Sequence, residues 1–268
     1  MRRRTEAIAV DHAGADTAAA VDSLQRGLEA LRCFKPGEDT LASAEIARRL
    51  ALPKATTRRL LDTLATQGFV LRVPDTEAYR LHVACFVVGQ AVLNGSLLVR
   101  KATPILQVLA NRFAVHALLC VRDRSDMLVL AHLAGTGAPP WALGAGARLP
   151  ITDTAPGRAW LWTEPPAAQG EWLARLRDSA PNGRTQAAGV YQAFHDIEQG
   201  GACFSFGEWR RDVGLAAAPL TLADGSKAVV ACVRLAAEPG RGRFERECTA
   251  AMVEAAAMIR DEAQHAHS

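Results

Sequence analysis

The stretch from Ser43 to Leu81 constrains the fold most, because two short helical patterns and a hairpin pattern follow one another there with almost no spacing. In the first pattern, apolar residues recur on one helix face, at Ile46, Ala47 and Leu50. Pro53 suits the first turn of a new helix, where the N–H that proline lacks has no helical partner. The order therefore predicts a helix, a tight turn and a second helix.

The second helix is expected to turn its apolar residues inward and its basic residues outward. Its inner face consists of Leu60, Leu61 and Leu64. Gly68 is placed to end this helix, as glycine commonly does just past a helix. Strand-like segments follow at 69–73 and 78–81, with a turn at 74–77 between them. These elements together predict a winged helix-turn-helix, which binds double-stranded DNA through its second helix.

The charge of this stretch also fits a DNA-binding surface. The net charge of the chain, +3, is too small to indicate a nucleic-acid partner, but residues 43–72 contain six basic and two acidic residues. The first turns of a recognition helix meet base edges, where arginine pairs well with guanine, while threonine and lysine mostly hold phosphate. We predict DNA contacts from Lys54, Thr56, Thr57, Arg58, Arg59, Arg72 and Arg80. Asp75 and Glu77 in the turn would be repelled by phosphate, so we do not expect the turn to insert deeply.

The same residues carry a family resemblance. The segments that carry it are Ser43-Ala44-Glu45-Ile46-Ala47, Leu52-Pro53-Lys54-Ala55-Thr56, Arg59-Leu60-Leu61 and Tyr79-Arg80-Leu81. They resemble the IclR family of bacterial transcription regulators, and the resemblance covers nearly everything after residue 22. It implies a winged helix-turn-helix followed by a GAF-like, ligand-sensing domain, with an operator in double-stranded DNA as one partner.

At 268 residues the chain can hold two domains of ordinary size. We expect a disordered tail at 1–22, the winged helix-turn-helix DNA-binding domain at 23–82, a linker and dimerisation helix at 83–100, and the effector-binding domain at 101–268. Ser23 is a good helix N-cap. The first helix is expected to turn inward the residues Leu24, Leu28, Leu31 and Phe34.

The linker assignment depends on the nearly uncharged segment from Val83 to Leu98. A helix that is apolar on most sides needs cover on most sides, and the edge of one domain seldom supplies it. A second copy of the chain would supply that cover, and the family resemblance favours this interpretation. The alternative is a helix buried inside the C-terminal domain.

The C-terminal half mixes strand and helix patterns. Thr103-Pro104 is expected to open a helix that reaches Phe113, and apolar runs at 115–121 and 127–133 predict a hairpin. Helical stretches at about 167–177 and 187–199, three more strand-like runs and a long final helix complete the half. The final helix has an apolar stripe of Phe244, Cys248, Met252, Ala255 and Ile259. This order predicts an α+β domain with one antiparallel sheet.

An effector pocket is expected where three features of this half converge. The family resemblance implies that the Thr-Ala-x-Gly motif at 154–157 cradles a carboxylate at a helix start, where free N–H groups and the helix dipole favour anions. The other features are the segment 203–209 and the strand that carries Arg234. An inward Arg234 would offer a charge to an acidic ligand, and a surface position for it is equally well supported. The predicted pocket residues are Thr154, Ala155, Gly157, Cys203, Ser205, Trp209, Asp212, Cys232 and Arg234.

Catalytic, metal and cofactor chemistry have little support in the sequence. A nucleophile elbow would need glycine at 203, where Cys203 stands, and no histidines share the His-x-x-x-His spacing. His116 and His132 lie in apolar strands and are more typical of hydrogen-bonded core residues. The six cysteines lie far apart, which favours reduced thiols in a cytoplasmic protein. No apolar run is long enough to cross a membrane.

We therefore expect a homodimeric or tetrameric transcription regulator, either repressor or activator, that senses a small carboxylate metabolite. The stretch from Phe204 to Pro219 is similar to family members that control aromatic-acid catabolism, so an aromatic acid is expected. The alternative is a GAF-like small-molecule-binding protein or metabolic enzyme whose helical N-terminal domain does not read DNA.

Overall fold

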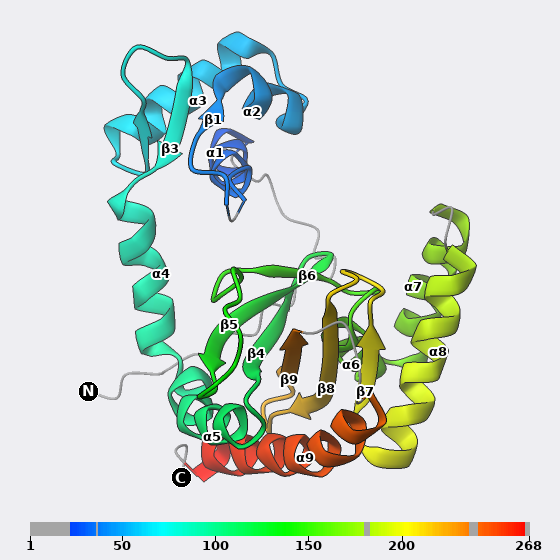
Figure 1. Cartoon of the computed structure of the whole chain (residues 1–268). Coiled ribbons are helices and arrows are strands. Elements are labelled where there is room, and N and C mark those ends of the chain that lie inside the picture. Colours follow the sequence, from blue (N-terminus) through cyan, green and yellow to red (C-terminus); the bar gives the residue numbers. More distant parts are fainter. Residues whose placement is uncertain (1–21, 36, 180–182, 236–240, 266–268) are drawn as a thin grey trace. The chain divides into compact units, whose positions relative to one another are not determined.

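The structure, a computed structural model, describes residues 22–35, 37–179, 183–235 and 241–265 (Figure 1). Its described residues divide into two compact units, with the boundary between Gly95 and Ser96. Both units contain helices and antiparallel strands, so the expected α+β class is confirmed. The predicted tail at 1–22 lies outside the described residues except for its last residue, Asp22, which is helical.

The first unit contains the expected winged helix-turn-helix. Its elements are α1 (Asp22–Arg32), β1 (Leu41–Ala42), α2 (Ser43–Leu50), α3 (Lys54–Thr66), β2 (Val70–Arg72) and β3 (Ala78–Leu81). The three strands form an antiparallel sheet in the order β1-β3-β2. A small core packs the sheet against the helices through Ala30, Cys33, Leu41, Ile46, Leu61, Val70 and Tyr79. Gly68 follows α3 at a φ of +74°, the left-handed conformation that favours glycine.

The first helix differs from its prediction. α1 begins at Asp22, so Ser23 lies inside its first turn instead of capping it. Leu24 and Leu28 are exposed, and the buried residues of the helix are Gly27 and Ala30. Leu31 and Phe34, the other two residues expected to face inward, are half-buried and pack against the small core.

The helix α4 (Val83–Gly95) ends the first unit and buries none of its residues. Its exposed apolar side chains are Val83, Phe86, Val87, Val88 and Val92. The linker helix expected at 83–100 is interrupted at Ser96, which is the N-cap of the next helix. No single described helix is long and apolar enough to cross a membrane, although α4 and α5 pass that test when taken together as a bent pair.

The second unit is built on a six-stranded antiparallel sheet in the order β6-β5-β4-β9-β8-β7 (Figure 1). Its strands are β4 (His116–Asp123), β5 (Asp126–Ala134), β6 (Arg148–Pro150), β7 (Cys203–Phe206), β8 (Val213–Thr221) and β9 (Lys227–Leu235). Its helices are α5 (Leu97–Phe113), α6 (Ala155–Trp162), α7 (Pro166–Ser179), α8 (Gly183–Gly200) and α9 (Arg241–His265).

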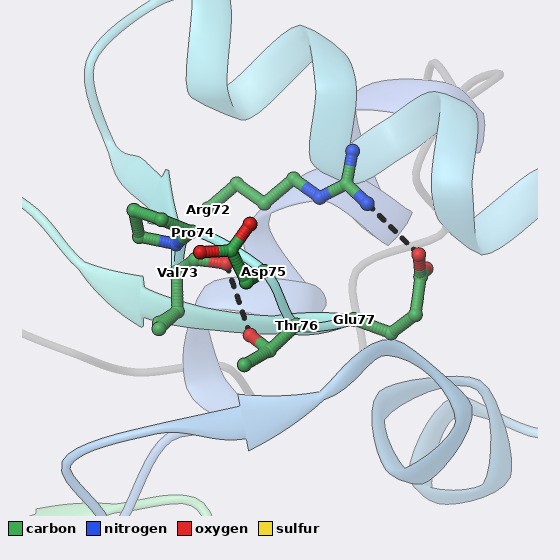
Figure 2. Close-up of a pocket in the computed structure, with 6 residues that line it drawn as sticks. All are labelled: Arg72, Val73, Pro74, Asp75, Thr76 and Glu77. Atoms are coloured by element: carbon green, nitrogen blue, oxygen red, sulfur yellow. Dashed lines mark hydrogen bonds and ion pairs between the residues drawn. The ribbon is translucent and has the colours of Figure 1, made fainter.

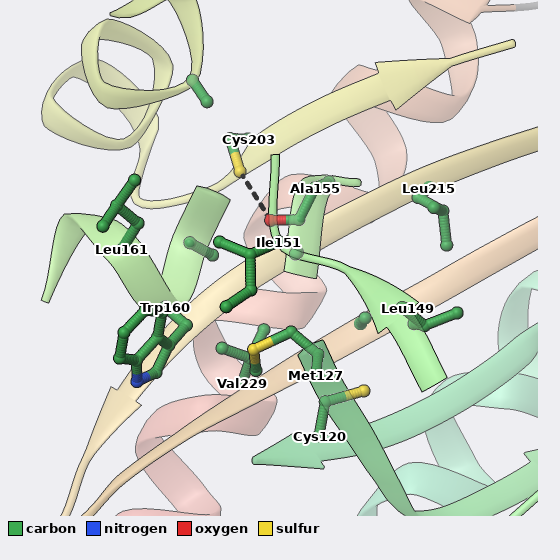
Figure 3. Close-up of a cluster of buried hydrophobic side chains, with 14 of the residues drawn as sticks. Cys120, Met127, Leu149, Ile151, Ala155, Trp160, Leu161, Cys203, Leu215 and Val229 are labelled. Carbon is green, nitrogen blue, oxygen red and sulfur yellow. Dashed lines mark hydrogen bonds between the residues drawn. The ribbon is translucent and has the colours of Figure 1, made fainter. Parts of the chain in front are cut away.

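Each face of this sheet is covered by its own set of helices. One core lies between the sheet and the helices α6, α7 and α8, and Figure 3 shows part of it around Ile151 and Trp160. The other core lies between the sheet and the helices α5 and α9. Because successive side chains of a strand point to opposite faces, odd and even positions of one strand enter different cores. This alternation decides which strand residues can meet at a site.

Three details of the second unit can be compared with the expected pattern. α5 begins at Leu97, seven positions before Pro104, because Ala102 and Leu106 are both fully buried and hold the proline inside the helix. The segment from Leu143 to Pro150, which contains two glycines, ends in the edge strand β6. The final stripe is confirmed at Cys248, Met252, Ala255 and Ile259, which are buried, whereas the side chain of Phe244 lies outside the description.

Candidate DNA-binding and effector sites

The helix α3 presents its basic residues to solvent. Lys54, Arg58 and Arg59 are exposed, and neither arginine forms an ion pair or a side-chain hydrogen bond with a residue that the structure describes. Thr56 is half-buried. Thr57 is fully buried, and its hydroxyl donates to the carbonyl of Pro53 at 3.2 Å. The predicted contact from Thr57 is therefore corrected, because its side chain is buried and bonded within the first turn of α3.

The two wing arginines point to opposite faces of the small sheet. Arg72 pairs with Tyr79 across the sheet and shares its face, while Arg80 pairs with Leu71 on the other face. Figure 2 shows Arg72 held by an ion pair with Glu77 at 2.8 Å, beside a hollow of about 480 Å³ lined by residues 72–77. Burial and Asp62 raise the pKa of Tyr79, while Arg72 and Arg58 oppose that shift, so both arginines lie near its ring.

Two other basic residues of the first unit are occupied within it. Arg49 bonds both carboxylate oxygens of Glu38, at 2.7 and 2.8 Å, and donates to the backbone carbonyl of Cys33 at 2.7 Å. Arg48 and Arg49 also bond Glu45. These hydrogen bonds to arginine lower the pKa of Glu38 and of Glu45 to about 2. The basic stretch thus divides into residues that hold the fold and residues that face solvent.

The start of α6, where an anion site was expected, has its N–H groups satisfied within the chain. The N–H of Ala155 donates to Ser205 Oγ at 2.9 Å, and that of Gly157 to Thr154 Oγ1 at 3.4 Å. Pro156 has no N–H, and the N–H of Arg158 donates to the carbonyl of Thr154. Thr154 is the buried N-cap. An anion could bind here only by displacing one of these oxygens, and Thr154 Oγ1 is itself anchored, because it donates to the carbonyl of Pro150 at 2.6 Å.

Gly157 is required by packing. A Cβ at this position would overlap the backbone of Ile151, so α6 approaches that loop as closely as only glycine allows. Cys203 and Ser205 approach the same helix start from β7, and Cys203 Sγ lies 3.4 Å from the carbonyl of Ala155 (Figure 3). Burial raises the pKa of the Cys203 thiol well above its usual range, so it behaves as a packing residue. The structure therefore brings together five of the predicted pocket residues.

The formal charge at this helix start belongs to Arg158, a residue absent from the predicted set. Its side chain is 2% exposed and forms a bidentate ion pair with Glu208, whose side chain is 39% exposed. Its Nε donates to the carbonyl of Thr152 at 2.8 Å. A Cβ on Gly189 of α8 would overlap the guanidinium. An arginine between Gly157 and Ala159 in an otherwise apolar helix was the sequence signal for this buried pair.

The remaining predicted pocket residues do not meet at α6. Cys232 packs in the core beneath α5 and α9, and Arg234, two residues along β9, shares that face and is exposed. Phe204 and Phe206 pack against the same core. The predicted approach of Arg234 and Cys232 to the helix start is therefore corrected, because strand alternation directs them to the opposite face. Trp209 packs against the α6 side, while Asp212 is exposed and bonds Arg210.

Comparison with known proteins extends over both units. The family model of the IclR helix-turn-helix domain matches residues 23–74, and that of the bacterial transcriptional regulator IclR C-terminal domain matches residues 90–265. The acetate operon repressor of Salmonella typhimurium is 31% identical over 143 residues, which cover 53% of this chain and 52% of the repressor. The chain thus spans about half the length of the first curated relatives it matches.

Two solved structures are similar over nearly the whole chain. An IclR family transcriptional regulator from Brucella abortus is 32% identical with a TM-score of 0.83, covering 92% of this chain and 95% of that one. An IclR homolog from Microbacterium hydrocarbonoxydans, complexed with 4-hydroxybenzoate, is 21% identical with a TM-score of 0.70, covering 91% and 99%. The second likeness concerns the fold alone.

Proposed function

The chain belongs to the IclR family of bacterial transcriptional regulators, and we propose that it binds an operator through α3 and responds to a small carboxylate through its second unit. The observation that carries the DNA-binding part is the pair Arg58 and Arg59, exposed and without an ion-pair partner among the described residues. Unpaired arginines at the start of a recognition helix are positioned to contact base edges and phosphates. Lys54, Thr56, Arg72 and Arg80 are proposed to add further contacts.

Operator titrations test this part directly. Arg58→Ala or Arg59→Ala should each weaken binding to DNA from the chain's own promoter by about 1–3 kcal/mol, because each removes a charged contact. Arg26→Ala, which removes the same charge from α1, is the matched control and should bind as the parent does. Binding should fall steeply with salt. Full operator binding by an Arg58/Arg59 double mutant would overturn the assignment.

We also propose that two copies of the chain associate through α4. The support is the row of exposed valines together with Phe86 on a helix that has no charged residue. Helix-turn-helix proteins read paired half-sites as dimers, so a second copy supplies both the missing cover and the second recognition helix. Effector binding would then favour one arrangement of the two copies and change the spacing of their recognition helices.

The effector part of the proposal names a small carboxylate, with an aromatic acid as the expected class. The homolog complexed with 4-hydroxybenzoate supports that class. Within this chain, Arg158 replaces Arg234 as the charge that meets the carboxylate. Its two outer nitrogens are occupied by the carboxylate of Glu208, a group of the same chemistry as the effector. We propose that the effector carboxylate displaces Glu208, which is partly exposed and so has a path into solvent.

Calorimetry with benzoate, 4-hydroxybenzoate and acetate tests this exchange. Glu208→Gln keeps the shape of the side chain but removes the competing charge, so an aromatic acid should bind roughly tenfold more tightly than to the parent. Arg234→Ala, on the other face of the sheet, should leave the affinity unchanged. An unchanged affinity in Glu208→Gln would contradict the exchange, and absence of binding by all three acids would contradict carboxylate sensing.

A further inference from the structure

A cluster of three aromatic rings lies on the α6 side of the sheet, apart from the helix start. His116 in β4 and His132 in β5 lie with ring centroids 5.0 Å apart, and Trp141 lies 5.4 and 5.6 Å from them. His116 follows the alternation of Leu118 and Cys120, which belong to the α6-side core, and Trp141 packs against that core. His116 is buried, while His132 and Trp141 are half-buried.

The hydrogen bonds of the two histidines determine where their protons lie. His116 Nε2 is 2.8 Å from the carbonyl oxygen of Pro139, which can only accept, so Nε2 carries the hydrogen. In a neutral ring, His116 Nδ1 is then an acceptor, and His132 Nε2 must donate to it across 2.9 Å. Burial lowers the pKa of His132, and the neighbouring His116 lowers it further, which keeps the His132 ring neutral. His132 Nδ1 is therefore left as an acceptor, with no donor among the described residues.

Trp141 supplies the complementary group. Its indole Nε1 is buried and has no hydrogen-bond acceptor among the described residues. A buried donor without a partner is destabilising, so such groups usually have an unseen partner. The loop that carries Trp141 is fixed: Thr136 N bonds Asn111 at 3.0 Å, Gly146 N bonds Val129 at 2.8 Å, and two prolines precede the tryptophan. The indole ring is thus held in place with its centroid 5.6 Å from that of the His132 ring.

We propose that His132 and Trp141 form a subsite for a hydroxyl group carried on the ring of an aromatic effector. A hydroxyl oxygen can accept from the indole N–H while its hydrogen is donated to His132 Nδ1, so one group satisfies both side chains. A carboxylate fits less well, because it has no hydrogen for His132 Nδ1. The surrounding rings favour an aromatic carrier. The inference rests on the proposed effector function and narrows its ligand to a hydroxylated aromatic acid.

The test compares benzoate, 3-hydroxybenzoate, 4-hydroxybenzoate and phenol by calorimetry on the full chain. At least one hydroxybenzoate should bind the parent tenfold or more tightly than benzoate. Trp141→Phe keeps an aromatic ring but removes the donor, so this preference should fall below about threefold while benzoate binds as before. His132→Phe should lose the preference as well. His132→Asn, whose amide oxygen can stand near the place of Nδ1, should retain part of it.

Thermal melting and operator binding without ligand check that each variant is folded. Nitrogen NMR of the parent, which needs no variant, should show the Nδ1 resonance of His132 shifting with the hydroxybenzoate and not with benzoate. Benzoate binding with no gain for either hydroxybenzoate would overturn the subsite and leave the carboxylate proposal standing. A phenol affinity lowered by Trp141→Phe, with benzoate inactive, would support the subsite and overturn the carboxylate proposal. Failure of all four probes to bind would overturn both.

Discussion

The two units of the chain treat their arginines in opposite ways. In the first unit, Arg58 and Arg59 extend into solvent without ion-pair partners among the described residues. In the second, Arg158 is 2% exposed and held by Glu208 and a backbone carbonyl. A charge that meets DNA at a surface is already hydrated and needs no internal partner. A charge inside a fold loses its hydration and must be paired until a ligand takes over that partner's place.

The largest expected effect tests whether the exposed apolar residues of the first unit have a function, as its exposed arginines are proposed to have. Val88, 54% exposed on α4, should be covered by a second copy of the chain. Val88→Asp should then weaken association by about 3–5 kcal/mol, because a buried charge would lack a partner. Light scattering should find monomer or aggregate, with loss of operator binding. The matched control is Val108→Asp on α5, where the valine is 69% exposed. An unchanged dimer in Val88→Asp would remove α4 from the interface.

A second prediction tests whether the effector unit is organised by packing. Gly157→Ala places a methyl group against the backbone of Ile151 and should destabilise the unit by about 3 kcal/mol in denaturant unfolding. Gly170→Ala is the control, because nothing lies within 4 Å of that added methyl and the residue is inside α7. It should stabilise by about 0.5–1 kcal/mol. If Gly157→Ala instead lowered only effector affinity, Gly157 would serve the ligand and not the fold.

A smaller effect concerns Arg72, the wing arginine that pairs with Glu77. Glu77→Gln releases Arg72 from its exposed ion pair, and operator affinity should rise by about 0.5–1 kcal/mol. Asp75→Asn removes the same charge from the wing tip without releasing Arg72, so it should strengthen binding less. Equal gains from the two variants would indicate that only the net charge of the wing matters.

The smallest expected effect concerns how the stability of the first unit depends on pH. Because arginine bonds hold the folded-state pKa of Glu38 and Glu45 at about 2, below their ordinary value of 4.5, both groups stabilise the first unit above that ordinary value. This contribution is lost as the pH falls from 4.5 towards 2. Acid titration followed by circular dichroism should therefore show a shallower decline in a Glu38→Gln/Glu45→Gln variant. Identical profiles would mean that these pairs contribute nothing.

The comparison also explains what the sequence could and could not predict. On α3, the helical repeat relates each residue to the inner face marked by Leu61, so the exposure of Arg58 and Arg59 could be predicted. Thr57 was wrongly predicted to face DNA because it is polar, although it is buried. On β9, the face of Arg234 depends on pairing with Gly214, which is twenty residues away. Local patterns do not contain that register. Arg158 was missed because its partner, Glu208, lies fifty residues further along the chain.

The bare α-carbon of Gly189 has an evolutionary consequence. The guanidinium of Arg158 fills the space that any other side chain at position 189 would need, so the glycine cannot change while the arginine remains. A lineage that loses the arginine gains room for alanine or serine on α8, and one that keeps it must keep the glycine. We expect positions 158 and 189 to covary among descendants of a common ancestor. Where they do, the pair would indicate which relatives retain an internally neutralised cation at the start of α6.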